Sequence, residues 1–107
     1  MNQEYAAFIN DHGMYLEEKL GVKEWAFTRA DALKLLEIMK QAQMPNIGGD
    51  VVIENEGGLN YTNDSWYYNR SDHETQEQYV VSSISKAEEY IKNYPERGGG
   101  KYYYVTG

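Results

Sequence analysis

Apolar side chains recur at helical spacing in three parts of the chain. The first part, residues 5–12, predicts a short helix that ends at Gly13, because glycine commonly follows the last turn of a helix. The second part begins after Thr28, whose hydroxyl can accept a hydrogen bond from an unpaired backbone N–H at a helix start. Its apolar stripe predicts a helix that Pro45 closes. The stripe consists of Ala32, Leu35, Leu36, Met39 and Gln43.

The third apolar repeat predicts a long helix near the carboxyl end. Ser71 and Glu74 have the spacing of a capping box, which predicts the start of this helix, and Pro95 predicts its end. An alternative is a short strand at residues 78–82 followed by a separate helix, because Tyr79-Val80-Val81 has high β-propensity. The spacing favours one helix. Its repeat consists of Val80, Ile84, Ala87, Ile91 and Tyr94.

Runs of β-branched and aromatic residues predict the strands. Residues 51–53 are β-branched throughout, and a glycine pair separates them from a second strand at residues 59–69, which we expect to be bent at Asn63-Asp64. Residues 22–27 and 101–106 also have extended patterns. These elements predict an α+β fold, in which two or three helices pack on one face of a small, mainly antiparallel sheet.

Length and composition limit the class of protein. The chain has 107 residues, which fits a single domain over residues 1–107. It contains no cysteine, which excludes disulfides, thiolate catalysis and the common zinc sites. No apolar run reaches the roughly 20 residues of a membrane span, and the first residues lack the pattern of a signal peptide. We therefore expect a cytoplasmic protein that does not enter a membrane.

Negative charge is concentrated in one window of the sequence. Between Asp50 and Glu77 the net charge is −6, out of −7 for the whole chain, and Arg70 is the only fixed cation there. The acidic pI of about 4.7 argues against direct binding of nucleic acid. A localised field of one sign instead indicates a basic protein partner. The acids are Asp50, Glu54, Glu56, Asp64, Asp72, Glu74 and Glu77.

Large aromatic residues lie within the same acidic window. Because side chains alternate across a strand, Trp66 and Tyr68 should lie on one face of the sheet and Tyr67 on the other. One of these faces is expected to be core, so Trp66 is either a structural residue or an interface anchor. The candidate contact surface consists of Asp50, Glu54, Glu56, Asp64, Trp66, Tyr67, Asp72, Glu74 and Glu77.

Catalytic and metal sites are less well supported by the sequence. Asp72, His73 and Glu74 are adjacent, and adjacent side chains point in different directions, whereas zinc needs convergent ligands. A small hydrolase using Asp50 and Asp64 would need a deep cleft that a chain of this length rarely builds. We predict no catalytic residues, no metal and no cofactor.

Several short motifs occur in an order that resembles one bacterial family, immunity protein 40. They are Trp25-Ala26-Phe27-Thr28, Gly48-Gly49-Asp50-Val51, Asp64-Ser65-Trp66-Tyr67 and the segment from Ser83 to Ile91. Two positions depart from the expected pattern. Ser65 stands where asparagine is expected, and Asn46 is a polar residue in an otherwise apolar position.

The resemblance implies a protein of polymorphic toxin or contact-dependent growth inhibition systems. Such an immunity protein protects its producer by binding a cognate toxin domain. A nuclease toxin needs Lys and Arg to hold phosphate, and carboxylates can compete for these cations. We therefore expect a non-enzymatic nuclease inhibitor that binds through its acidic, aromatic surface. The alternatives are a small carbohydrate- or peptide-binding domain and the hydrolase considered above.

Overall fold

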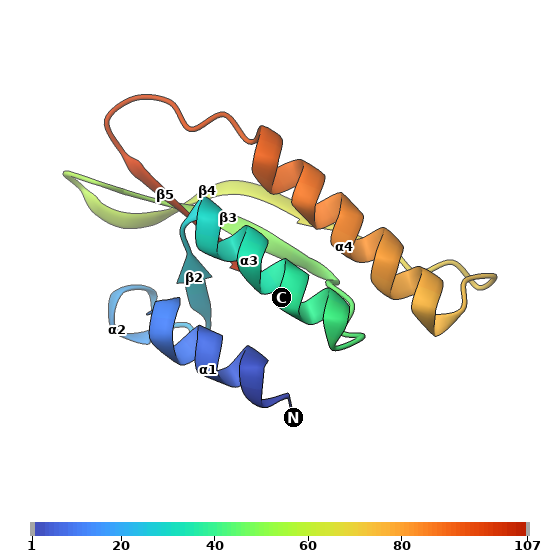
Figure 1. Ribbon diagram of the computed structural model, residues 1–107. Helices are drawn as coiled ribbons and strands as arrows, with labels where there is room; N and C mark the ends of the chain where they lie inside the picture. Colours follow the sequence, from blue (N-terminus) through green and yellow to red (C-terminus); the bar gives the residue numbers. More distant parts are fainter. Residues whose placement is uncertain (1, 107) are drawn as a thin grey trace.

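The computed structural model describes residues 2–106 and has an antiparallel sheet with helices on both sides (Figure 1). The strand order is β1-β2-β5-β3-β4, and every neighbouring pair is antiparallel. The predicted α+β class is confirmed. In chain order the elements are α1 (Gln3–His12), β1 (Met14–Tyr15), α2 (Glu17–Leu20), β2 (Trp25–Phe27), α3 (Arg29–Gln41), β3 (Gly48–Asn55), β4 (Gly58–Tyr67), α4 (Gln76–Asn93) and β5 (Lys101–Thr106).

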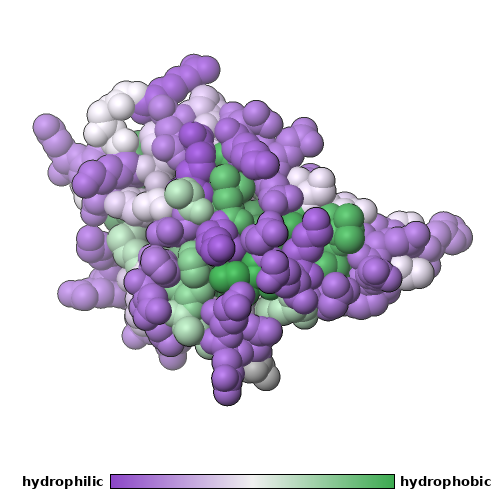
Figure 2. All heavy atoms as spheres, viewed as in Figure 1, coloured by the Kyte–Doolittle hydropathy of each residue, from purple (hydrophilic) through white to green (hydrophobic). Residues whose placement is uncertain are grey.

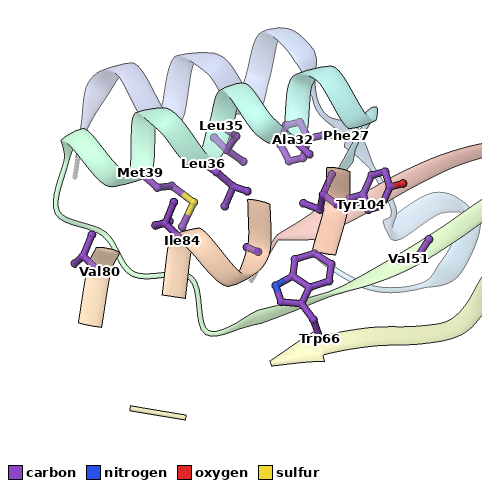
Figure 3. Packing of buried hydrophobic residues seen from close by; sticks show 12 residues of the cluster. Phe27, Ala32, Leu35, Leu36, Met39, Val51, Trp66, Val80, Ile84 and Tyr104 are labelled. Atoms are coloured by element: carbon purple, nitrogen blue, oxygen red, sulfur yellow. The ribbon is translucent and has the colours of Figure 1, made fainter. Parts of the chain in front are cut away.

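The two faces of the sheet build two hydrophobic clusters. Val51 and Tyr104 point to the larger cluster, where the long helices α3 and α4 contribute most of the packing and α1 adds partly buried side chains (Figures 1 and 3). The next residue along each strand, Val52 or Val105, points to the smaller cluster, which the segment around α2 covers with Leu16. Alternation along the strands therefore assigns each β-branched residue to a defined layer.

The start of α3 is confirmed, but its end was predicted too late. The Thr28 Oγ1 accepts a hydrogen bond from the Asp31 N–H at 3.3 Å, which satisfies one unpaired donor at the helix start. The helix ends at Gln41, and Gln43 lies beyond it in a left-handed conformation with φ 58° and an exposed side chain. The assignment of Gln43 to the apolar stripe was wrong, because the chain leaves the helix there to turn toward β3.

The start of α4 lies later than the predicted capping box. Thr75 precedes the first helical residue, Gln76, and forms the reciprocal capping box with Gln78 of the first turn. Ser71 and Glu74 instead close a separate turn. Both pairs have the same three-residue spacing, so the pattern alone does not distinguish a helix start from an isolated turn. One long helix is confirmed, and the alternative strand at residues 78–82 is wrong.

The outer strand β4 is bulged as predicted. Its register with β3 shifts between Asp50 and Val52, and Asn63 within the shifted segment has φ 74°. Asparagine tolerates this left-handed backbone better than most residues, which explains why the bulge forms there. The strand ends at Tyr67, two residues earlier than expected, and β3 extends to Gly48 on one side and Asn55 on the other.

Arg29 ties the carboxyl end of α4 to the first residue of α3. Its Nε donates to the Ile91 carbonyl at 3.0 Å, and its Nη2 donates to the Tyr94 carbonyl. Nη2 also lies 3.5 Å from the Glu96 carboxylate, which accepts a 2.6 Å hydrogen bond from the Tyr104 hydroxyl. One guanidinium therefore satisfies helix-end carbonyls that would otherwise lack donors.

We predict that Arg29→Met lowers the free energy of unfolding by about 2 kcal/mol, because hydrogen bonds to a charged donor are lost at a partly buried helix end. Lys34→Met, on an exposed position of the same helix, is the matched control. Urea denaturation measures both variants, and equal losses would contradict the role given to Arg29.

Candidate functional site

The predicted contact residues do not gather on one surface. Asp50 and Glu54 lie in β3, and Glu56 lies at the turn between β3 and β4. Asp72 and Glu74 lie in the loop that leads to α4. Figure 1 shows the β3–β4 turn and this loop at opposite ends of a molecule that is 45 Å long. Although these acids are close in sequence, the β3–β4 hairpin separates them in space.

The acids of β3 lie on the sheet face opposite α3 and α4. Asp50 and Glu54 alternate with Val51, which points to the helices. Glu54 already has partners within the chain. Its carboxylate lies 3.3 Å from the Lys19 Nζ and accepts a hydrogen bond from the Tyr103 hydroxyl. On this face, burial and the nearby Glu24 and Asp50 carboxylates raise the pKa of Tyr61.

Asp64 lies on the helix side of the sheet, away from Asp50. Its carboxylate accepts a 2.7 Å hydrogen bond from the hydroxyl of Tyr94, which follows α4. Asp50 pairs in register with Ser65, the next residue along β4, so the Asp50 and Asp64 side chains point to opposite faces. The two carboxylates cannot act on one substrate, and the proposed Asp50–Asp64 hydrolase pair is not formed.

The loop before α4 holds Glu74 firmly. Its carboxylate accepts a 2.6 Å hydrogen bond from the Tyr68 hydroxyl and a 2.8 Å bond from the Ser71 N–H. The Tyr68 hydroxyl and then the Ser71 N–H lower the pKa of Glu74, because both bonds favour the charged carboxylate. The neighbouring acids Asp72 and Glu77 are exposed instead.

Most of the acidic window has no cation beside it. Residues 2–106 contain three ion pairs, and Glu54 is the only window acid in them. The one window cation, Arg70, donates to the Gln76 side chain and the Glu74 carbonyl and lies over the Tyr79 ring. The negative charge of the window is consequently left for solvent or for a partner.

Trp66 belongs to the core and not to the contact surface. Its side chain is 4% exposed and points from β4 into the cluster that contains Tyr104 (Figure 3). Its Nε1 donates to the Asn46 Oδ1 at 3.0 Å, and the Asn46 N–H donates to the Ser83 Oγ of α4 at 3.0 Å. Asn46 is therefore a buried hydrogen-bonding residue, which explains the polar side chain at this position. Tyr67, one residue further, is 64% exposed, and Tyr68 lies beyond the end of β4.

Sequence analysis missed a groove between α4 and β4. The groove has a volume of about 860 Å³, and one side of α4 supplies most of its lining. The sequence signal was weak: Val81 and Tyr90 are large side chains outside the apolar repeat of the helix, and Val81 is 47% exposed. Figure 2 shows that hydrophilic residues otherwise cover most of the helix-side face. The lining residues are Asp64, Val81, Ser82, Ser85, Lys86, Glu89, Tyr90, Asn93, Tyr94 and Pro95.

A family comparison identifies the chain. The model of the family described as Immunity protein 40 matches residues 16–106, which is most of the sequence. The chain belongs to the immunity protein 40 family. Neither the curated proteins nor the solved structures contained a match. Membership of an immunity protein family implies a cognate toxin as the partner.

Within residues 2–106, no three side chains of the metal-binding types come together. The same part of the chain has no helix that is both long enough and apolar enough to cross a bilayer.

We predict that Trp66→Phe lowers the free energy of unfolding of the immunity protein by about 2 kcal/mol, because the indole N–H and buried volume are lost together. Tyr67→Ala should cost less than about 1 kcal/mol, since the ring is exposed and touches Lys86 at the surface. Urea denaturation compares the two. A loss for Tyr67→Ala as large as that for Trp66→Phe would contradict the division between core and surface.

The lowered pKa of Glu74 predicts a dependence of stability on pH. Its charged form stabilises the fold above the unfolded-state pKa of about 4.3, and this stabilisation is lost as the pH falls through the lower folded-state pKa. Glu74→Gln should therefore be less stable than the parent at pH 7, and the difference should shrink toward acid pH. Asp72→Asn, in the same loop, is the control. Thermal unfolding at several pH values measures this, and a constant difference for Glu74→Gln would refute the assignment.

Proposed function

We propose that this immunity protein neutralises a basic nuclease toxin by covering it with the acidic end, which comprises Tyr67, Asp72 and Glu77. The proposal rests on one observation: these acids are exposed and have no ion-pair partner within residues 2–106. Asp72 and Glu77 lie in and just after the loop that joins β4 to α4. Asp50, Glu54 and Glu56 lie elsewhere, and Asp64 lies beside Tyr94 at the opposite end of α4, so these acids are not part of this surface.

Charge supports a nuclease as the target. An enzyme that holds phosphate needs exposed Lys and Arg, and carboxylates form charge-assisted hydrogen bonds with the same side chains. An immunity protein with a net charge of −7 can thus occupy the place of nucleic acid on the toxin. Binding alone would block the toxin, so the proposal needs no catalytic step, and the contact would take place in the cytoplasm.

Tyr67 supplies an apolar contact beside the acids. Its ring is 64% exposed, and the Lys86 Nζ lies 5.2 Å from the ring centre. Tyrosine is enriched in interface cores because it buries a large area at low cost in side-chain entropy. We therefore propose Tyr67 as the anchor and the surrounding acids as the groups that steer the toxin.

Co-expression with the toxin domain encoded immediately upstream tests the proposal. Cells that make the immunity protein should survive the toxin, and purified toxin should lose its nuclease activity when the two proteins are mixed. Full toxicity in the presence of the immunity protein would refute a protective function. Protection from a toxin without nuclease activity would refute the assigned target class.

We predict that Asp72→Lys combined with Glu77→Lys slows association by about tenfold or more at low salt and flattens its salt dependence. The matched control combines Glu4→Lys and Glu37→Lys, which changes the charge equally. Glu4 and Glu77 both lie in the first turn of a helix. Stopped-flow association measures the rates. Equal slowing by both pairs would show that only net charge matters and that the acidic end is not the contact surface.

A further inference from the structure

The groove between α4 and β4 has walls of two different kinds. On one wall, Val81, Tyr90 and Tyr94 present apolar and aromatic surface from α4 and the residues after it. On the other, Asp64 lies on β4, which is the last strand of the sheet. No other strand of the described chain pairs with the outer side of β4, so its backbone donors and acceptors there are available.

The aromatic wall is held rigidly from below. The Tyr90 ring lies 5.0 Å from the buried Trp66 ring and 5.9 Å from the Tyr94 ring, measured between ring centres. Burial, and then the negative charge of Asp64, raises the pKa of Tyr90. The Tyr90 hydroxyl and the Asp64 carboxylate are therefore close to each other in the groove. A side chain entering the groove would therefore meet a preformed surface and would need little rearrangement of the protein.

The groove has unequal charge along its length. Lys86 lies at the end near Tyr67, where its ammonium faces the tyrosine ring. Asp64 and Glu89 are both exposed, and Asp64 receives one hydrogen bond, which leaves acceptor capacity on its carboxylate. An incoming Arg or Lys can bind there, whereas a second carboxylate would be repelled.

We propose that this groove holds one extended segment of the toxin domain, which pairs with the outer edge of β4. An apolar or aromatic side chain of the segment packs on Tyr90 and Tyr94, and a basic side chain binds Asp64. A strand edge beside side-chain pockets is the arrangement used to bind extended peptides. This inference rests on the proposed function, because it names the part of the toxin that the immunity protein recognises.

Ser85 provides the test, since it lines the groove, is exposed and lies outside the core. Ser85→Arg and Ser85→Gln should each place a longer side chain in the groove, obstruct the bound segment and raise the Kd for the purified upstream-encoded toxin domain by about tenfold or more. Gln41→Arg, at an exposed position at the end of α3, adds the same charge as Ser85→Arg away from the groove. It should change the Kd by less than about twofold. Thermal unfolding confirms that all three variants remain folded.

The outcomes separate the two proposals. If the parent protein does not bind this toxin domain, the proposed function fails and the groove assignment fails with it. If the parent binds and the Ser85 variants bind as tightly as Gln41→Arg, the groove assignment alone is overturned. Amide hydrogen exchange tests the strand pairing in the complex. We expect slower exchange in residues 64–67 of β4, and unchanged exchange there would overturn the pairing with the edge.

Discussion

The hydrogen bonds around Asn46 determine where α4 lies on the sheet. Asn46 is fully buried, accepts a bond from the Trp66 indole in β4 and donates its backbone N–H to Ser83 in α4. Ser83 in turn donates to the Val80 carbonyl. A buried polar group without a partner costs more than the bond itself contributes, so sliding the helix along the sheet would be costly. The same bonds therefore fix which side of α4 faces the core and which side lines the groove.

A single step along β4 separates core from surface. Trp66 points into the core, and Tyr67 is mostly exposed. Such a step works because strand side chains alternate and the register with β3 is fixed near this end by the pairing of Gly49 with Trp66. Gly49 is needed there, since a Cβ at this position would lie 2.1 Å from the Val105 carbonyl oxygen. The close packing of Gly49 against Trp66 therefore also sets the position of the exposed Tyr67 ring.

Much of the fold could be predicted from the sequence, because helix and strand periods are local properties. The repeat from Val80 identified α4, and the Asn63-Asp64 pair identified the bulge in β4. Gln43 was misassigned because the turn out of α3 depends on where β3 begins. The contact surface was predicted less well. Neighbouring acids such as Asp50 and Asp64 are close in sequence yet lie on opposite faces, and the groove exists only once α4 is placed over β4.

The open edge of β4 also affects whether two copies of the protein associate with each other. Within residues 2–106, β4 has ten residues and no partner strand on its outer side, so it is a template on which a second copy could add its own strand. This strand contains no Lys or Arg, and it carries Asp64 and follows Glu56, so two copies placed edge to edge would bring carboxylates together. The bulge at Asn63 further interrupts a straight pairing. The carboxylates and the bulge would thereby keep identical molecules apart and oppose self-assembly in a crowded cell.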